Sequence, residues 1–265
     1  MSQAIDLRGR TAFIAGGTSG INLGIAEHFA TLGANLVLLS RSQDKVDAAV
    51  ASCTTLGAST IGFAADVRDY DAIENAYKST ADKFGGVDCV IAGAAGNFLA
   101  PLVGLSHKGF KTVIDIDLMG AFNTLRASWD YLAKPGASLM AITAGQAVNP
   151  KPMQAHACAA KAGINMLVKC MAMEWGPAGV RVNAISPGPI AETEGMDRLA
   201  PTPEAEAAIK AKLPLRDYGT KADVAAMAAF LASDLAKYVT GSIFNVDGGN
   251  DLGDATADCL TVPQR

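Results

Sequence analysis

The sequence predicts an α/β fold, in which a doubly wound, seven-stranded parallel sheet forms a single domain of 265 residues. Seven short apolar runs recur along the chain, with a segment of helical spacing between each run and the next. The runs are continuous and do not alternate in polarity, which is typical of strands buried on both faces. Strands that alternate with helices are joined by right-handed crossovers, so the strands are expected to be parallel.

The expected elements follow one another from near the N-terminus to residue 249. The strands span residues 11–17, 34–41, 59–67, 87–96, 137–145, 181–188 and 242–249. The helices span residues 22–32, 42–56, 69–84, 106–133, 154–175 and 220–233. Because one sheet accounts for almost the whole chain, we expect one domain over residues 1–265.

Two segments interrupt the alternation. Residues 189–219 form a long connection rich in Pro, Ala and Glu. We expect one or two short helices there, acting as a substrate lid, because long connections in such folds often cover the ligand. Residues 250–265 form a C-terminal tail without a strong pattern, which we expect either to fray or to dock on a neighbouring subunit.

Composition excludes several classes of function. The net charge of −4 and the isoelectric point near 5.4 argue against a nucleic-acid partner. No apolar run approaches the roughly 20 residues of a membrane span. The polar start and the ending "PQR" match neither a signal peptide nor a peroxisomal address, so we expect a cytoplasmic protein. Five cysteines without a C-x-x-C pair predict reduced thiols and no metal site.

A glycine-rich turn, "AGGTSGINLG", follows the first strand. Such a turn lets the backbone approach a pyrophosphate at a helix N-terminus, so it predicts a Rossmann-type dinucleotide site. The residues expected at the phosphates are Gly16, Thr18, Ser19, Gly20 and Asn22. Asn22 stands where a third glycine is usual, and its side chain is expected to bond either the pyrophosphate or a neighbouring loop.

The second strand ends with Ser40 and Arg41 and carries no carboxylate. A carboxylate there would bond a ribose 2′-hydroxyl and repel a 2′-phosphate. A hydroxyl and a guanidinium suit a 2′-phosphate, so we predict NADPH in preference to NADH. Asp66 and Val67 end the third strand, and Asp66 is expected to accept a hydrogen bond from the adenine amino group. The alternative for Asp66 is a helix cap for the segment that starts at Asp69.

These motifs resemble the short-chain dehydrogenase/reductase family over essentially the full length. The matching pieces are Gly16-x-x-x-Gly20, "AGAAG" at 92–96, Lys161 and "RVNAISPGPI" at 181–190. The resemblance implies a Rossmann-type domain, a nicotinamide cofactor and, as is usual in the family, a homotetramer. The small-residue, apolar helix at 154–175 and the strand at 242–249 also favour a partner subunit, because such faces need to be covered.

The chain departs from the family at its usual catalytic set of Asn, Ser, Tyr and Lys. The corresponding residues are Asp117, Ala144, Ala157 and Lys161. Proton transfer of the kind that the tyrosine supplies is worth about 10²–10⁴ in rate. An ordinary ketone reductase should not tolerate this loss.

Within the family, "AAGNFLAPLVGLS" at 94–106 and "QAHACAAK" at 154–161 resemble NADPH-dependent 2,4-dienoyl-CoA reductases of the peroxisomal type, and the ending indicates a bacterial relative. The resemblance implies reduction of 2,4-dienoyl-CoA thioesters to enoyl-CoA in unsaturated fatty acid β-oxidation, with hydride added to C5 and a proton to the α-carbon. Asp117 is expected on the long helix, buried among apolar neighbours and facing the site, so we expect it to hold a proton or pass one through water. By the resemblance, Lys161 binds the nicotinamide ribose, and Asn97 orients the thioester or a water.

The resemblance also implies the remaining contacts. Further cofactor residues are Gly96, Pro187, Gly188, Pro189 and Ile190. The acyl-CoA residues are Arg41, Arg68, Phe98, Ser106 and Arg198. Two alternatives stay open: a catalytically silent NADPH-binding relative, and a carbonyl reductase that uses His156 as its acid.

Overall fold

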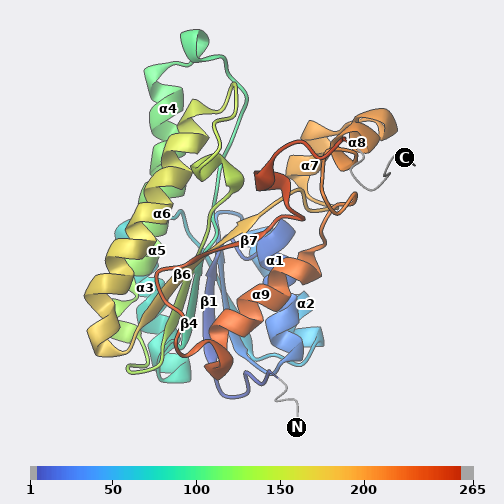
Figure 1. The fold of residues 1–265 in the computed structure, drawn as a ribbon. Coiled ribbons are helices and arrows are strands. Elements are labelled where there is room, and N and C mark those ends of the chain that lie inside the picture. Colours follow the sequence, from blue (N-terminus) through green and yellow to red (C-terminus); the bar gives the residue numbers. More distant parts are fainter. Residues whose placement is uncertain (1–4, 258–265) are drawn as a thin grey trace.

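The computed structural model describes residues 5–257 and has three layers, with one sheet between two groups of helices (Figure 1). All neighbouring strands pair in parallel, in the order β3-β2-β1-β4-β5-β6-β7, which confirms the predicted fold. The strands are β1 (Thr11–Ala15), β2 (Asn35–Ser40), β3 (Thr60–Ala64), β4 (Cys89–Ala92), β5 (Ser138–Ile142), β6 (Arg181–Pro187) and β7 (Ile243–Val246).

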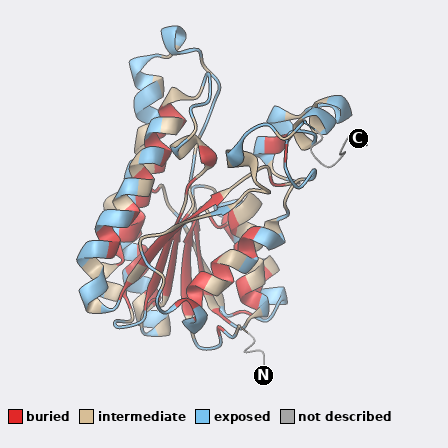
Figure 2. Cartoon of the chain, in the orientation of Figure 1, coloured by how far each residue is buried: buried red, intermediate tan, exposed pale blue. Residues whose placement is uncertain are grey.

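Helices cover both faces of the sheet, and each face has its own apolar core. One face packs against α1 (Gly20–Thr31), α2 (Gln43–Thr55) and α9 (Lys221–Ala232). The other packs against α3 (Tyr70–Phe84), α5 (Gly120–Ala127) and α6 (Ala155–Trp175). Figure 2 shows the central strands buried between these layers. This burial explains why the strand sequences are continuously apolar.

The helix expected over residues 106–133 has a different internal structure. It begins as α4 (His107–Val113), passes through a π-helical segment, η2 (Ile114–Met119), and continues as α5. A π-turn places one extra residue in the helix and changes which side chains face inward; such turns are frequent at functional sites. Within this turn Asp117 is buried, whereas Asp115 pairs with Lys111 near the surface.

Short helical turns connect the main elements. They are η1 (Leu102–Gly104), η3 (Trp129–Tyr131), η4 (Gly145–Ala147), η5 (Gly176–Ala178), η6 (Asp234–Ala236) and η7 (Asn250–Leu252). The connection at 189–219 contains α7 (Glu194–Leu199) and α8 (Pro203–Lys210), as expected, and extends from the body of the molecule (Figure 1).

The described part of the C-terminal tail packs on its own chain. The amide of Ala255 donates to the carbonyl of Lys212 at 3.0 Å, and Arg216 donates to the carbonyl of Ala255 at 2.5 Å. Cys259 and the rest of the tail lie outside the described residues. Within residues 5–257, no helix has both the length and the apolar character needed to cross a membrane.

Candidate functional site

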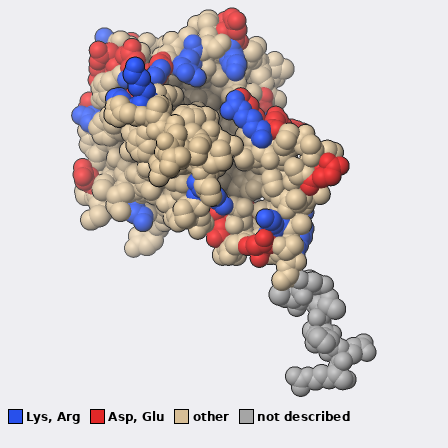
Figure 3. Space-filling view, turned by 90° about the horizontal axis from the view of Figure 1, so that it is seen from above, with Lys and Arg blue, Asp and Glu red and all other residues tan. Residues whose placement is uncertain are grey.

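A cavity of about 340 Å³ opens at the carboxyl ends of β1 to β4. The strand order reverses direction between β1 and β4, and ligands of open α/β sheets bind at such a switch point. Seen from above, this end of the molecule is hollowed, and basic and acidic side chains lie on the rim (Figure 3). The lining residues are Gly16, Thr18, Ser19, Asn22, Leu39, Ser40, Arg41, Ser42, Lys45, Ala65, Asp66, Val67, Gly93, Ala94, Ala95, Ile116 and Glu194.

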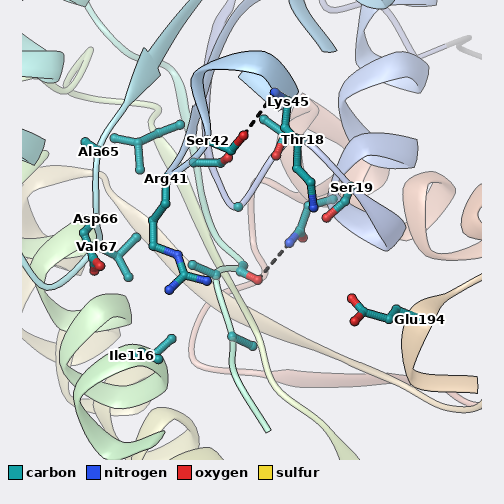
Figure 4. Close-up of a pocket in the computed structure, with 17 residues that line it drawn as sticks. Thr18, Ser19, Arg41, Ser42, Lys45, Ala65, Asp66, Val67, Ile116 and Glu194 are labelled. Atoms are coloured by element: carbon teal, nitrogen blue, oxygen red, sulfur yellow. Dashed lines mark hydrogen bonds between the residues drawn. The ribbon is translucent and has the colours of Figure 1, made fainter. Parts of the chain in front are cut away.

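The glycine turn closes one side of this cavity. Gly16 and Gly20 have positive φ angles of 77° and 54°. Asn22 donates from Nδ2 to the carbonyl of Gly93 at 2.8 Å, so its side chain bonds the neighbouring loop (Figure 4). A Cβ atom on Gly93 would lie 2.3 Å from Asn22 Oδ1. Among the described residues Asn22 Oδ1 is buried and has no hydrogen-bond partner.

Two cations lie at the end of β2 and the start of α2. Arg41 directs its guanidinium into the cavity (Figure 4). Lys45 also lines the cavity, and its amide donates to Ser42 Oγ at 3.5 Å, which caps α2. Within residues 5–257, neither Arg41 nor Lys45 forms a salt bridge. Sequence reasoning missed Lys45, although it lies one helical turn beyond Arg41.

Asp66 lines the cavity beside Val67, but its carboxylate is held by Arg68. The Arg68 guanidinium donates to both Asp66 oxygens, at 2.9 and 2.6 Å. These bonds lower the pKa of Asp66 below its usual value. The cap of α3 is Asp69, whose carboxylate accepts from the amide of Ala72 at 3.0 Å. The helix-cap alternative for Asp66 is therefore wrong.

The structure brings Gly96, Asp117 and Lys161 together. The amide of Gly96 donates to Asp117 Oδ1 at 2.7 Å, and Lys161 Nζ lies 3.4 Å from Asp117 Oδ2. Lys161 Nζ also donates to the carbonyl of Ile142, at 3.1 Å, at the end of β5. Asp117 and Lys161 are 2% and 8% exposed. Both oxygens of Asp117 thus face N–H donors.

A chain of amides orients Asn97. Its Nδ2 donates to Gln154 Oε1 at 2.7 Å, and Gln146 Nε2 approaches the same oxygen at 3.3 Å. The loops after β4 and β5 are therefore joined in front of α6. Sequence reasoning did not single out Gln146 or Gln154, because their contacts link residues distant in the chain.

His156 is completely buried, and Phe98 packs edge-on to it with ring centroids 4.5 Å apart. The amide of Ala157 donates to His156 Nδ1 at 2.9 Å, so in the neutral ring Nε2 carries the hydrogen. Among the described residues Nε2 has no hydrogen-bond partner.

The family's two hydroxyl positions have no replacement nearby. Ala157 is buried, and Thr143, next to Ala144, directs its Oγ1 to the backbone carbonyl of Lys161 at 3.4 Å. A hydroxyl donor is therefore missing at both usual places.

The remaining predicted residues do not themselves line this cavity. Ser106 caps α4 by accepting from the amide of Gly109 at 3.0 Å, and Arg198 pairs with Glu194 within α7. Gly188 donates to the carbonyl of Val246 at 3.0 Å, which fixes the turn between Pro187 and Pro189, and Ile190 is buried. Of the acyl-CoA residues, Phe98 and Ser106 both approach Gly109, and Arg41 lies at the cavity with the Asp66 partner of Arg68.

Comparison with known proteins agrees with this geometry. The family model described as "Enoyl-(Acyl carrier protein) reductase" matches residues 15–251. A Saccharomyces cerevisiae peroxisomal 2,4-dienoyl-CoA reductase, (3E)-enoyl-CoA-producing, is 41% identical over 91% of this chain and 84% of its own. A Bacillus subtilis protein named "Probable 2,4-dienoyl-CoA reductase [(2E)-enoyl-CoA-producing]" is 36% identical over 92% of this chain and 97% of its own.

Among solved structures, levodione reductase matches with a TM-score of 0.87 and 28% identity, over 93% of this chain and 99% of its own. The parallel sheet, the glycine turn and the family match over most of the chain lead to one assignment. The chain belongs to the short-chain dehydrogenase/reductase family, and it is an oxidoreductase that uses a nicotinamide cofactor.

Proposed function

We propose that this protein reduces 2,4-dienoyl-CoA thioesters to enoyl-CoA with NADPH, in the β-oxidation of unsaturated fatty acids. The observation that carries the proposal is the combination of an intact Asp117–Lys161 contact with alanine at positions 144 and 157. Ketone reduction delivers a proton to oxygen and needs a hydroxyl donor at that oxygen. Dienoyl reduction delivers the proton to carbon, so it does not need the tyrosine. The similarity to 2,4-dienoyl-CoA reductases supports the same substrate class.

The lining of the cavity supports the choice of NADPH. Its glycine turn suits a pyrophosphate, and Arg41 and Lys45, beside the hydroxyls of Ser40 and Ser42, suit a 2′-phosphate. When bound, the nicotinamide supplies the hydride. We assign Lys161 to the ribose hydroxyls of the nicotinamide, and the turn at residues 187–190 to its amide.

Stabilising the thioester oxygen falls to Asn97. Hydride addition at C5 moves negative charge through the conjugated system to that oxygen, giving a dienolate. Gln154 occupies one side of the Asn97 amide, which leaves a second N–H for the developing charge. One such donor is worth about 2.7–4 kcal/mol of transition-state stabilisation. Because both oxygens of Asp117 are engaged, we assign it to holding Lys161 and to passing protons through water.

The acyl-CoA end of the site carries three arginines. Arg41, Arg68 and Arg198 are cations for the phosphates of coenzyme A, but Arg68 and Arg198 are paired with Asp66 and Glu194. We propose that these pairs open when the thioester binds and that the lid at 189–219 moves with Arg198. Phe98 is 41% exposed and offers an apolar surface to the acyl chain, and Ser106 caps the helix beside it.

The first prediction concerns cofactor choice. Arg41→Ala should raise the KM for NADPH by about 10- to 100-fold, because a charged hydrogen bond to phosphate is worth about 1.5–3 kcal/mol. The KM for NADH should change little, since NADH has no 2′-phosphate. Steady-state kinetics with both cofactors measures this, and Arg8→Ala, a remote exposed arginine, is the control. Equal preference for the two cofactors in the wild-type enzyme would contradict it.

The second prediction separates the candidate acid–base residues. Asp117→Ala should lower turnover of 2,4-hexadienoyl-CoA by about 10²–10⁴. His156→Ala should cost about tenfold or less, because it removes packing against Phe98. NADPH consumption with this thioester and with a panel of ketones measures both. A normal rate in Asp117→Ala together with loss in His156→Ala, or reduction of ketones alone, favours the carbonyl reductase. Binding of NADPH without any turnover favours the silent relative.

The third prediction restores the family's tyrosine. Ala157→Tyr should lower dienoyl reduction, since residue 157 is 4% exposed and the added ring must displace its neighbours. It should not improve the reaction, because the proton goes to carbon. A rate of thioester reduction above that of the wild-type enzyme would show that a phenol at this place does help.

The fourth prediction is a homotetramer. On α6, Met166 and Met173 are 59% and 82% exposed, Phe122 on the adjacent α5 is 37% exposed, and β7 ends the sheet with a free edge. Exposed apolar side chains on neighbouring helices favour a partner subunit. Light scattering at micromolar concentration should give a mass four times that of the chain, and a monomer would refute this.

A further inference from the structure

A second cavity, of about 370 Å³, lies outside the cofactor cavity and shares none of its lining residues. It is a groove between the loop that carries η1 and the segment that leads into α6, at the same end of the molecule (Figure 1). Apart from one lysine, every residue that lines it is apolar. The lining residues are Ala100, Leu102, Pro150, Lys151, Pro152, Met153 and Ala155. Binding sites of this size are mostly apolar in the same way, so we call it the apolar groove and ask what fills it.

The apolar groove is joined to the residues that hold Asn97. The amide of Ala100 donates to the carbonyl of Met153 at 2.9 Å, so the two walls are bonded to each other. Three residues before Ala100, Asn97 donates to Gln154, the residue after Met153, at 2.7 Å. An extended chain spans at most about 3.6 Å per residue, so the Cα atoms of Asn97 and Ala100 are no more than about 11 Å apart. A substrate whose thioester oxygen meets the Asn97 amide therefore has the groove within reach of its acyl chain.

The walls of the apolar groove are held open. Met153 has a φ angle of 65°, in the left-handed region that residues with a side chain rarely adopt. Such strained positions persist where the surrounding structure holds them, and they are frequent where ligands bind. Ala100 and Ala155 line opposite walls, and their small side chains leave the space between them free. Leu102 is largely exposed and continues the apolar surface outward.

An acyl chain is the occupant that these features favour. Lys151 is the one lining residue with a polar side chain, so the groove has little with which to bind a polar group. Phe98, next to Asn97, is also exposed and apolar. A six-carbon acyl group has five carbon–carbon bonds of about 1.5 Å and ends within about 8 Å of its thioester carbon. A ten-carbon chain spans up to about 14 Å, which carries its last carbons past Phe98 toward the groove.

We propose that the apolar groove binds the distal carbons of the acyl chain and makes the enzyme selective for dienoyl thioesters of ten or more carbons; this rests on the proposed function. The first six carbons lie along Asn97 and Phe98, and the carbons beyond them lie between Ala100 and Ala155. Burial of one methylene group is worth about fourfold in binding. Partial burial of four methylene groups in an open groove should therefore favour the longer chain by about 10- to 100-fold.

The test compares two chain lengths in the same enzyme. In the wild type, kcat/KM for 2,4-decadienoyl-CoA should exceed that for 2,4-hexadienoyl-CoA by about 10- to 100-fold. Leu102→Asp places a carboxylate on the lining, and Ala100→Phe fills the space. Each variant should bring the ratio of the two values to within about threefold of one, through the KM of the longer substrate. Because Leu102 is largely exposed, Leu102→Asp should fold even where Ala100→Phe does not.

The matched control is Val103→Asp. Val103 is the next residue in the chain, it is fully exposed, and it does not line the groove. This variant carries the same added charge and should keep the wild-type ratio. Inhibition by saturated thioesters gives a second measurement that needs no reaction of the ligand. Decanoyl-CoA should inhibit the wild type more strongly than hexanoyl-CoA does, and this difference should be lost in Leu102→Asp.

Three results would overturn the inference and leave the proposed function standing. The first is a wild-type enzyme that does not favour the longer thioester, and the second is a preference that survives in Leu102→Asp. The third is an equal loss for both thioesters in Leu102→Asp together with a changed mass in light scattering, because the groove would then be a contact between subunits. A wild-type enzyme that oxidises NADPH with neither thioester would overturn the proposed function and the inference with it.

Discussion

A buried carboxylate connects the parts of this site. Asp117 accepts from the Gly96 amide and faces the Lys161 ammonium, so it joins the π-turn, the loop after β4 and α6. Removing one partner of such a buried pair leaves an uncompensated charge, at a cost of about 3–5 kcal/mol. The π-turn is the local irregularity that accompanies this contact. In this segment the long helix departs from regular α-helical hydrogen bonding, and the departure allows the Asp117 side chain to be buried.

A second contact sets the wall of the cofactor cavity. Asn22 reaches from α1 to the carbonyl of Gly93, and a side chain at position 93 would collide with it. An asparagine in place of the usual third glycine therefore depends on a glycine some seventy residues later. The first turn and the loop after β4 are fixed to each other by this pair. Because the same loop continues to Gly96 and Asn97, the cofactor and substrate sides of the site share one support.

The fold could be predicted from the sequence because each buried strand corresponds to a local, continuous run of apolar residues. It was also sufficient for the family, through the glycine turn and Lys161. It did not reveal the π-turn, since a pattern of helical spacing tolerates one extra residue. The contact that Asn22 makes with Gly93 and the contacts among the side-chain amides of Gln146, Gln154 and Asn97 join residues that are distant in the chain. Such contacts follow from tertiary packing, which no local pattern encodes.

The missing hydroxyls are consistent with the rest of the site. A phenol beside a carbonyl serves a reaction in which oxygen takes the proton. In the reduction of a conjugated thioester, the thioester oxygen carries negative charge only in the dienolate intermediate. The protein therefore needs a hydrogen-bond donor to the oxyanion and a proton source near the α-carbon. We assign the oriented Asn97 amide to the first need and Asp117, acting through water, to the second. A phenol restored at position 157 would add nothing to proton delivery at carbon and would displace its neighbours, since Ala157 is buried.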